Sequence, residues 1–339
     1  CIAYEKFTKI CQESGIPGQV SQDVLADFLH DLGTVIHFSD FGLDGNHVLD
    51  PKWVTGAVYK VINAQTIADA NGILILEDLK DILLYEKGDA YQYTRNDFPY
   101  VIKLMKKFEL CYSLDEERVL IPDLLAVPRP SFAFDDTGAV RFTLKYEDFL
   151  PPAIMPRFIV KRHGEIVDDL RWRAGVVLEH PDLESKALVT QDKVDKRIDI
   201  KVKGKRSKVY FALLWLTLRE IHSDFKGLKV SERVPLPDDP DISVDYEMLL
   251  NNLEQGVERF VPEGRKTACS VHEILETIHP ESSSEAEDIA ALAEVGMQEG
   301  GMSEFIKKMN RYVEGDVRIL GLKFNYKNFF EDVLDHRKK

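Results

Sequence analysis

The sequence has few cysteines and no long apolar run. Its four cysteines, Cys1, Cys11, Cys111 and Cys269, are far apart and form no C-x-x-C pair. Such spacing predicts neither a zinc site nor a disulfide framework, and it favours a reducing, cytoplasmic setting. The longest apolar run, residues 209–218, is about half the length that a membrane span needs. The sequence therefore predicts no membrane-spanning helix.

Positive charge is also scarce. The 44 lysines and arginines are outnumbered by 58 aspartates and glutamates, which gives a formal net charge of −14. A strongly acidic chain repels nucleic-acid phosphates and anionic lipids, so neither is expected as the main partner. The composition, 44% apolar and 30% charged, is typical of a globular protein, and the 339 residues suggest two or three domains.

Motifs that carry chemistry are missing as well. The segments nearest to a phosphate-binding loop are 204–207 (GKRS) and 264–267 (GRKT). Both lack the first glycine and the contiguous Gly-Lys-Ser/Thr whose backbone amides wrap phosphates. The nine histidines show no metal-ligand spacing, and no nucleophile elbow or cysteine-centred catalytic signature is present. We therefore expect no catalytic residue, no metal site and no cofactor, which indicates a chain that is not itself an enzyme.

The most informative stretch lies in the first fifth of the chain. Ser21 is placed to cap a helix over 24–32, in which Val24, Leu25, Phe28, Leu29 and Leu32 are the apolar positions, and Gly33 is placed to end it. A β-branched and aromatic strand at 34–38 follows, and then a loop of turn-forming residues at 39–46.

A second helix is predicted to begin at Asp50-Pro51, because an aspartate N-cap followed by proline is typical of helix starts. We expect Trp53 in this helix to be a core residue. The same order of helix, strand, hairpin and proline recurs at 99–122. Residues 1–127 are therefore interpreted as two winged-helix-like units in tandem.

The segment 127–131 (VPRPS) is the predicted linker, since two prolines in three positions break any regular element. A second domain, 131–280, is predicted to be an antiparallel sheet covered by helices. Its strands are expected at 140–146, 169–179, 186–190, 197–203 and 228–236, and its main helices from 151 and over 207–222. Residues 281–339 are expected to form a mostly helical tail. The predicted fold class is α+β.

Four sequence blocks resemble one known domain. They are FLHDLGTVIHF at 28–38, VLDPKW at 48–53, FLPPAIMPRFIVKR at 149–162 and WRAGV at 172–176. Together, in this order, they resemble the two halves of the COR domain, which follows the Roc GTPase in Roco-family proteins, here of the bacterial leucine-rich-repeat type. The resemblance covers about residues 15–275.

The resemblance implies a non-catalytic, dimer-forming regulatory module. In the family, the first half of COR packs against the Roc GTPase of the same polypeptide, and the second half forms a homodimer that juxtaposes two GTPases and controls GTP turnover. GTP and magnesium are then expected only in the Roc domain. A start at Cys1 without methionine suggests a fragment of a longer parent protein.

Two sets of residues are candidates for these contacts. The GTPase-facing set, in the predicted loop and just after it, comprises Asp40, Phe41, Asp44, Asn46 and His47. The dimerisation set comprises Tyr210, Leu214, Trp215 and Leu218. The helix 207–222 is apolar nearly all round, whereas a helix on a sheet buries one stripe, so its remainder must meet the tail or a second subunit. The alternative interpretation is a winged-helix nucleic-acid-binding protein or a general protein-interaction scaffold.

Overall fold

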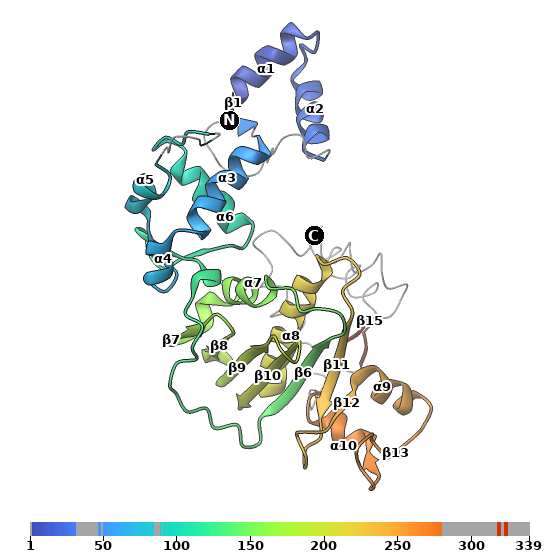
Figure 1. Cartoon of the computed structure of the whole chain (residues 1–339). Coiled ribbons are helices and arrows are strands. Elements are labelled where there is room, and N and C mark those ends of the chain that lie inside the picture. The colour runs from blue at the N-terminus through green and yellow to red at the C-terminus, as the bar shows by residue number, and fades with distance from the viewer. Residues whose placement is uncertain are drawn as a thin grey trace. The chain divides into compact units, whose positions relative to one another are not determined.

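The computed structural model describes residues 2–31, 47–48, 50–84, 89, 91–279, 317–319 and 322–324. The chain divides into two compact units, Cys1–Ala126 and Val127–Lys339 (Figure 1). The division falls at the proline-containing segment 127–131. The two units are described separately below.

The first unit combines helices with two small antiparallel sheets. Its helices are α1 (Tyr4–Glu13), α2 (Gln19–Asp31), α3 (Pro51–Ile62), α4 (Gln65–Asp69), α5 (Leu79–Ile82) and α6 (Phe98–Lys107), with 3-10 turns η1 (Leu76–Asp78) and η2 (Pro122–Leu124). Its strands are β1 (Ile2–Ala3), β2 (His47–Val48), β3 (Ile73–Ile75), β4 (Tyr112–Ser113) and β5 (Arg118–Leu120). The strand order is β3-β5-β4 in one sheet, and β1 pairs with β2 in the other.

The main core of this unit lies between α3, α6 and the three-stranded sheet. Trp53, Val61, Leu104 and Met105 are buried in it, which confirms Trp53 as a core residue. The predicted start of α3 is also confirmed, because the Asp50 carboxylate accepts a hydrogen bond from the Lys52 amide at 2.9 Å. An N-cap bond of this kind satisfies a backbone donor that the helix itself leaves without a partner.

The second half of the unit has the predicted element order, with α6 followed by β4, β5 and a proline turn. The winged-helix interpretation of the two halves stays a prediction. The predicted cap at Ser21 is wrong, because α2 begins at Gln19 and Ser21 lies inside it. The buried side chain of Gln22 donates to the Ile16 carbonyl at 2.7 Å, which closes the α1–α2 turn and lets the helix begin earlier. The predicted strand 34–38 and loop 39–46 lie outside the described residues.

The second unit contains a seven-stranded antiparallel sheet with the order β12-β11-β6-β10-β9-β8-β7 (Figure 1). Its strands are β6 (Val140–Tyr146), β7 (Ile166–Trp172), β8 (Gly175–His180), β9 (Ser185–Asp192), β10 (Arg197–Gly204), β11 (Val230–Pro235) and β12 (Ser243–Asp245). Its helices are α7 (Ile154–Lys161), α8 (Ser207–Ser223), α9 (Tyr246–Glu254) and α10 (Val271–Glu276), with 3-10 turns η3 (His163–Glu165) and η4 (Pro181–Leu183). Two short hairpins, β13 (Arg259–Phe260) with β14 (Cys269–Ser270) and β15 (Val317–Ile319) with β16 (Leu322–Phe324), complete the described elements.

The predicted antiparallel sheet with helices is confirmed, but one predicted strand is two. Residues 169–179, expected to form a single strand, instead form parts of β7 and β8, which pair as a hairpin with Trp172 opposite Gly175. A side chain at Gly175 would meet the Trp172 ring at 2.4 Å, so only glycine lets the two strands approach at this turn. The strand β12 was not predicted. Of the predicted helical tail, only the short hairpin β15–β16 lies among the described residues.

The two faces of the sheet differ in chemistry. Along β10, the side chains of Ile198, Ile200 and Val202 are buried, whereas those of Asp199, Lys201 and Lys203 alternate with them. Because successive strand residues point to opposite faces, the first set lies on one face and the second set on the other. Helix α8 packs on β6, β9 and β10 over the apolar face, with α7 beside it. The charged side chains therefore lie on the face opposite α8.

Two half-buried histidines of this unit have lowered pKa values. His222 Nε2 is hydrogen-bonded to the Tyr146 hydroxyl at 2.7 Å, and His279 Nε2 is 3.3 Å from the Tyr246 hydroxyl. Burial lowers the pKa of each imidazole to about 4, and the charge of Arg219 contributes further at His222. Charging either ring in the folded protein would place a cation where solvent stabilises it less.

Acid is therefore expected to destabilise the second unit. An exposed histidine has a pKa of about 6.5, so below that pH the unfolded chain binds protons that the folded chain does not. The free energy of unfolding should be fully retained above pH 6.5 and fall toward pH 4, by up to about 1.4 kcal/mol per pH unit for each histidine. Urea denaturation between pH 4.5 and 7 measures this slope.

The matched variants are His222→Gln and His163→Gln. His163 is exposed in η3 and does not contribute to the pKa shift of either histidine, so its removal should leave the slope unchanged. His222→Gln should remove about half of the pH dependence, because one of the two half-buried groups is gone. An identical slope in both variants would show that His222 is not a source of the acid sensitivity.

Candidate interaction surfaces

The part of the chain that the structure describes shows no group that could act as a metal centre. Within it, no cluster of three or more histidine, cysteine, aspartate or glutamate side chains could hold a metal ion. No helix among these residues is long and apolar enough to cross a membrane. Gly204, in the first of the two segments that resemble a phosphate loop, ends an antiparallel strand and is packed against the Glu184 carbonyl.

The predicted GTPase-facing residues are described only in part. Asp40, Phe41, Asp44 and Asn46 lie outside the described residues, so their contacts stay a prediction. His47 lies in β2, where its backbone pairs with Ala3 of β1. The strand β1 was missed because two residues are too few to show a pattern. The pairing of β1 with β2 places Ala3 beside His47, the last residue of the predicted GTPase-facing set.

The residues that follow this loop are firmly held. Besides capping α3, the Asp50 carboxylate accepts a hydrogen bond from the Tyr91 hydroxyl at 2.5 Å, and this bond lowers the pKa of Asp50. The Tyr93 hydroxyl donates to the Trp53 carbonyl at 2.9 Å, and the two rings are 5.2 Å apart. Because Gly56 has no side chain, the Tyr93 hydroxyl fits against α3 there. The segment 91–93 thus anchors the helix start that follows β2.

Helix α2 presents an exposed apolar stripe. Val20, Val24 and Phe28 are 76%, 62% and 57% exposed. Because residues four apart share one face of a helix, the three side chains form a single row. On the inner side of α2, Ala26 is buried with Leu25 and Leu29 packed against it. The apolar positions of this helix therefore divide between an inward and an outward face, which spacing alone did not reveal.

A shallow depression lies beside this stripe. Its volume is about 480 Å³, and it is lined by Gly15, Ile16, Pro17, Ser21, Val24, Leu25 and Phe28. Large apolar side chains scattered singly on a surface are common, but a contiguous row next to a hollow is typical of a contact site. The stripe of Val20, Val24 and Phe28, together with this depression, is called the α2 surface below.

The predicted dimerisation residues are not on a surface. Tyr210, Leu214, Trp215 and Leu218 are all fully buried within the chain. Tyr210 donates its hydroxyl proton to Glu165 of η3 at 2.7 Å. The rest of α8 was expected to meet the tail or a second subunit, and in this structure the four side chains are buried within the chain.

Residues of α9 and β11 pack against one flank of α8. The Trp215 ring stacks on Phe211 at 5.8 Å and meets Tyr246 edge-on at 5.5 Å. Its Nε1 donates to Glu232 of β11 at 2.8 Å, and Arg219 lies 4.1 Å over the ring while binding the same carboxylate. Sequence spacing could not show this, because Tyr246 comes from an element well beyond α8.

A core substitution distinguishes the two interpretations of α8. Leu214→Ala should lower the free energy of unfolding of the second unit by about 2–5 kcal/mol, because it leaves a cavity in a packed core. Val194→Ala is the control, since Val194 is 89% exposed. Urea denaturation and light scattering on both variants give the result. A Leu214→Ala protein of unchanged stability and altered oligomeric state would place Leu214 on an interface.

Comparison with known proteins identifies the two units. Residues 1–125 match the family described as C-terminal of Roc, COR-A domain, and residues 137–277 match the C-terminal of Roc, COR-B domain. A "Roc-COR-CHAT protease" of Runella zeae is 30% identical over 241 residues, which are 68% of this chain and 24% of that protein. "Probable serine/threonine-protein kinase pats1" of Dictyostelium discoideum is 27% identical over 193 residues, 52% of this chain and 6% of that protein.

A solved structure is similar in part. The RocCORdC structure of Roco2 from Methanosarcina barkeri, bound to GDP, is 49% identical over 37% of this chain and 38% of that chain, with a TM-score of 0.34. The chain spans a quarter or less of the length of the two curated relatives above. Because the two family matches together cover most of the residues, the chain belongs to the Roco family and contains its COR-A and COR-B domains.

Proposed function

We propose that this chain is the non-catalytic regulatory part of a Roco-family GTPase. COR-A packs against the Roc GTPase domain of the same polypeptide, and COR-B pairs two copies so that two GTPases are juxtaposed and GTP turnover is controlled. Support comes from the COR-A and COR-B matches and from a relative named for Roc and COR together. GTP and magnesium are then held by the Roc domain. A cytoplasmic parent protein with leucine-rich repeats fits this proposal.

The observation that carries the proposal is the α2 surface. Val20, Val24 and Phe28 are exposed together on one helix face in COR-A. Helix α2 ends at Asp31, shortly before the predicted interface residues Asp40 to His47. One continuous segment of COR-A then supplies an apolar helix face and a polar loop to the GTPase. Aromatic anchors such as Phe28 supply most of the energy at interfaces of this kind.

The proposed homodimer uses other residues than the sequence suggested. Since α8 is buried within COR-B, the pairing surface consists of residues outside the set Tyr210, Leu214, Trp215 and Leu218. The proposed dimerisation through COR-B rests on the membership of the Roco family.

Charge placed on the α2 surface tests the contact with the GTPase. Val24→Asp and Phe28→Asp should each weaken binding of the separately produced Roc domain of the parent protein by at least about tenfold, because each buries a carboxylate in an apolar contact. Titration calorimetry on the wild-type and variant chains measures the affinity. Both residues are exposed, so the melting temperature of the chain should stay the same.

The matched control is Val194→Asp, the same substitution at an exposed valine of COR-B. It should leave the affinity for the Roc domain unchanged. If Val24→Asp and Phe28→Asp bind as tightly as the control, the α2 surface does not contact the GTPase and the proposal loses its main support.

A further inference from the structure

The segment that leads into COR-B lies against the face of the sheet opposite α8. Trp172, Val177 and Leu188 form a small apolar cluster there, and Phe132 and Phe134 pack on it. Val177 pairs with Leu188, and Leu188 pairs with Lys201, so these side chains share the charged face rather than the α8 face. Residues 129–137 therefore cross a face of the sheet that α8 does not cover.

Aromatic contacts hold the first part of this segment. The Phe132 ring is 5.9 Å from the Trp172 ring. The Arg129 guanidinium lies 4.5 Å from the centre of Phe132 and 5.7 Å from that of Trp172, so it covers both rings. Alternate residues of an extended chain point the same way, which lets Phe132 and Phe134 reach the sheet together while Ala133 is exposed.

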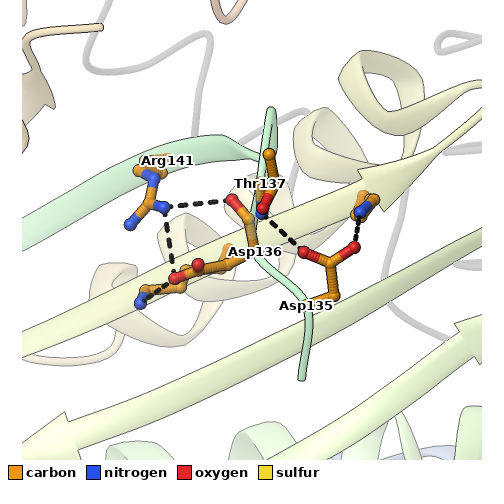
Figure 2. Close-up of polar contacts among 6 residues, drawn as sticks. Asp135, Asp136, Thr137 and Arg141 are labelled. Atoms are coloured by element: carbon orange, nitrogen blue, oxygen red, sulfur yellow. Dashed lines mark hydrogen bonds and ion pairs between the residues drawn. The ribbon is translucent and has the colours of Figure 1, made fainter. Parts of the chain in front are cut away.

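Ion pairs hold the second part (Figure 2). Figure 2 shows Asp135 and Asp136 turned toward basic side chains on β6 and β10. Asp135 pairs with Lys203, and Asp136 pairs with Lys201 at 2.6 Å and with Arg141 at 3.2 Å. The backbone amide of Thr137 donates to the Asp135 carboxylate at 3.1 Å and turns the chain toward β6. Two carboxylates thus meet three cations of the sheet.

The contacts that hold this segment are mainly side-chain contacts, and several of them are partly exposed. Residues 129–136 belong to no helix or strand, so no backbone ladder joins them to the sheet. The Asp135 and Lys203 side chains are 68% and 40% exposed. Exposed ion pairs contribute little to stability and are screened by salt. Phe132 and Phe134 are half-buried, whereas the core on the α8 side is fully buried.

We propose that residues 129–137 are a releasable latch, and that this sheet face is a docking surface for an extended segment with two alternate aromatic residues followed by two carboxylates. The chain's own latch occupies the surface. When the latch is docked, only residues 127 and 128 connect it to COR-A. When it is released, residues 127–139 are free, and a flexible chain of that length spans about 20 Å on average.

The latch thus determines how much free chain links COR-A to COR-B. The latch is independent of the GTPase role proposed above, because it involves only residues 129–137 and the COR-B sheet. A competing acidic and aromatic peptide would release the latch by occupying the same surface.

Protease accessibility in the intact chain tests the latch. Chymotrypsin cleaves after Phe132 or Phe134 only when the segment leaves the sheet and enters the protease active site in extended form. The double variant Lys201→Glu/Lys203→Glu should raise the cleavage rate about tenfold by repelling Asp135 and Asp136. Added salt should raise the rate in the wild type, because it screens the same pairs.

The control is Lys80→Glu/Lys229→Glu, which reverses two lysines paired with Glu77 and Glu147, neither of them in the latch. It should cleave at the wild-type rate. The exchange Asp135→Lys/Lys203→Glu should restore slow cleavage, which a merely destabilised sheet would not do. Equal rates in the Lys201/Lys203 variant and the control would overturn the proposal.

A peptide experiment tests the docking surface directly. A labelled peptide with the sequence of residues 129–137 should bind a chain in which those residues are replaced by glycine and serine. It should bind the wild-type chain at least tenfold more weakly, because a tethered competitor has an effective concentration in the millimolar range. A scrambled peptide is the control. Equal binding of the peptide to both chains, or binding to neither, would contradict the latch.

Discussion

The aromatic cluster around Phe142 determines the architecture of COR-B. The Phe142 ring on β6 contacts Phe211 at 5.0 Å, Trp215 at 5.4 Å and Tyr246 at 6.2 Å, and so joins the sheet to α8 and α9. Aromatic pairs of this geometry contribute about 0.5–1.5 kcal/mol each beyond the area that they bury. The cluster thus joins β6, α8 and α9 in one core.

The elements of COR-B that could be predicted are those whose pattern is local. The alternation of Ile198, Ile200 and Val202 with charged residues indicated β10, and the helix predicted at 207–222 is α8. The β7–β8 turn was missed because only Gly175 marks it, and its role depends on the Trp172 ring across the hairpin. The contacts of Glu232 and Tyr246 with α8 could not be predicted either, because these residues lie well beyond the helix in the sequence.

In COR-A, too, local features could be predicted, whereas contacts between distant residues could not. The cap at Asp50 could be predicted because donor and acceptor are two residues apart, whereas the bond from Tyr91 to the same carboxylate joins residues 41 apart. The exposure of Val20, Val24 and Phe28 on α2 could not be predicted, because an apolar helix pattern does not show which residues face the core. The resemblance of four short blocks to the COR domain is confirmed by the family matches. It identified the family where residue chemistry alone indicated only an interaction module.

We propose that this chain links self-association to GTP turnover in its parent protein. In this proposal the α2 surface contacts the GTPase, and the latch adjusts the length of free chain between COR-A and COR-B. The most direct measurement is the GTP hydrolysis rate per molecule of the parent protein over a range of concentrations, with light scattering on the same samples. The rate should change at the concentration at which monomers become dimers. A rate per molecule that stays constant through that transition would contradict the account.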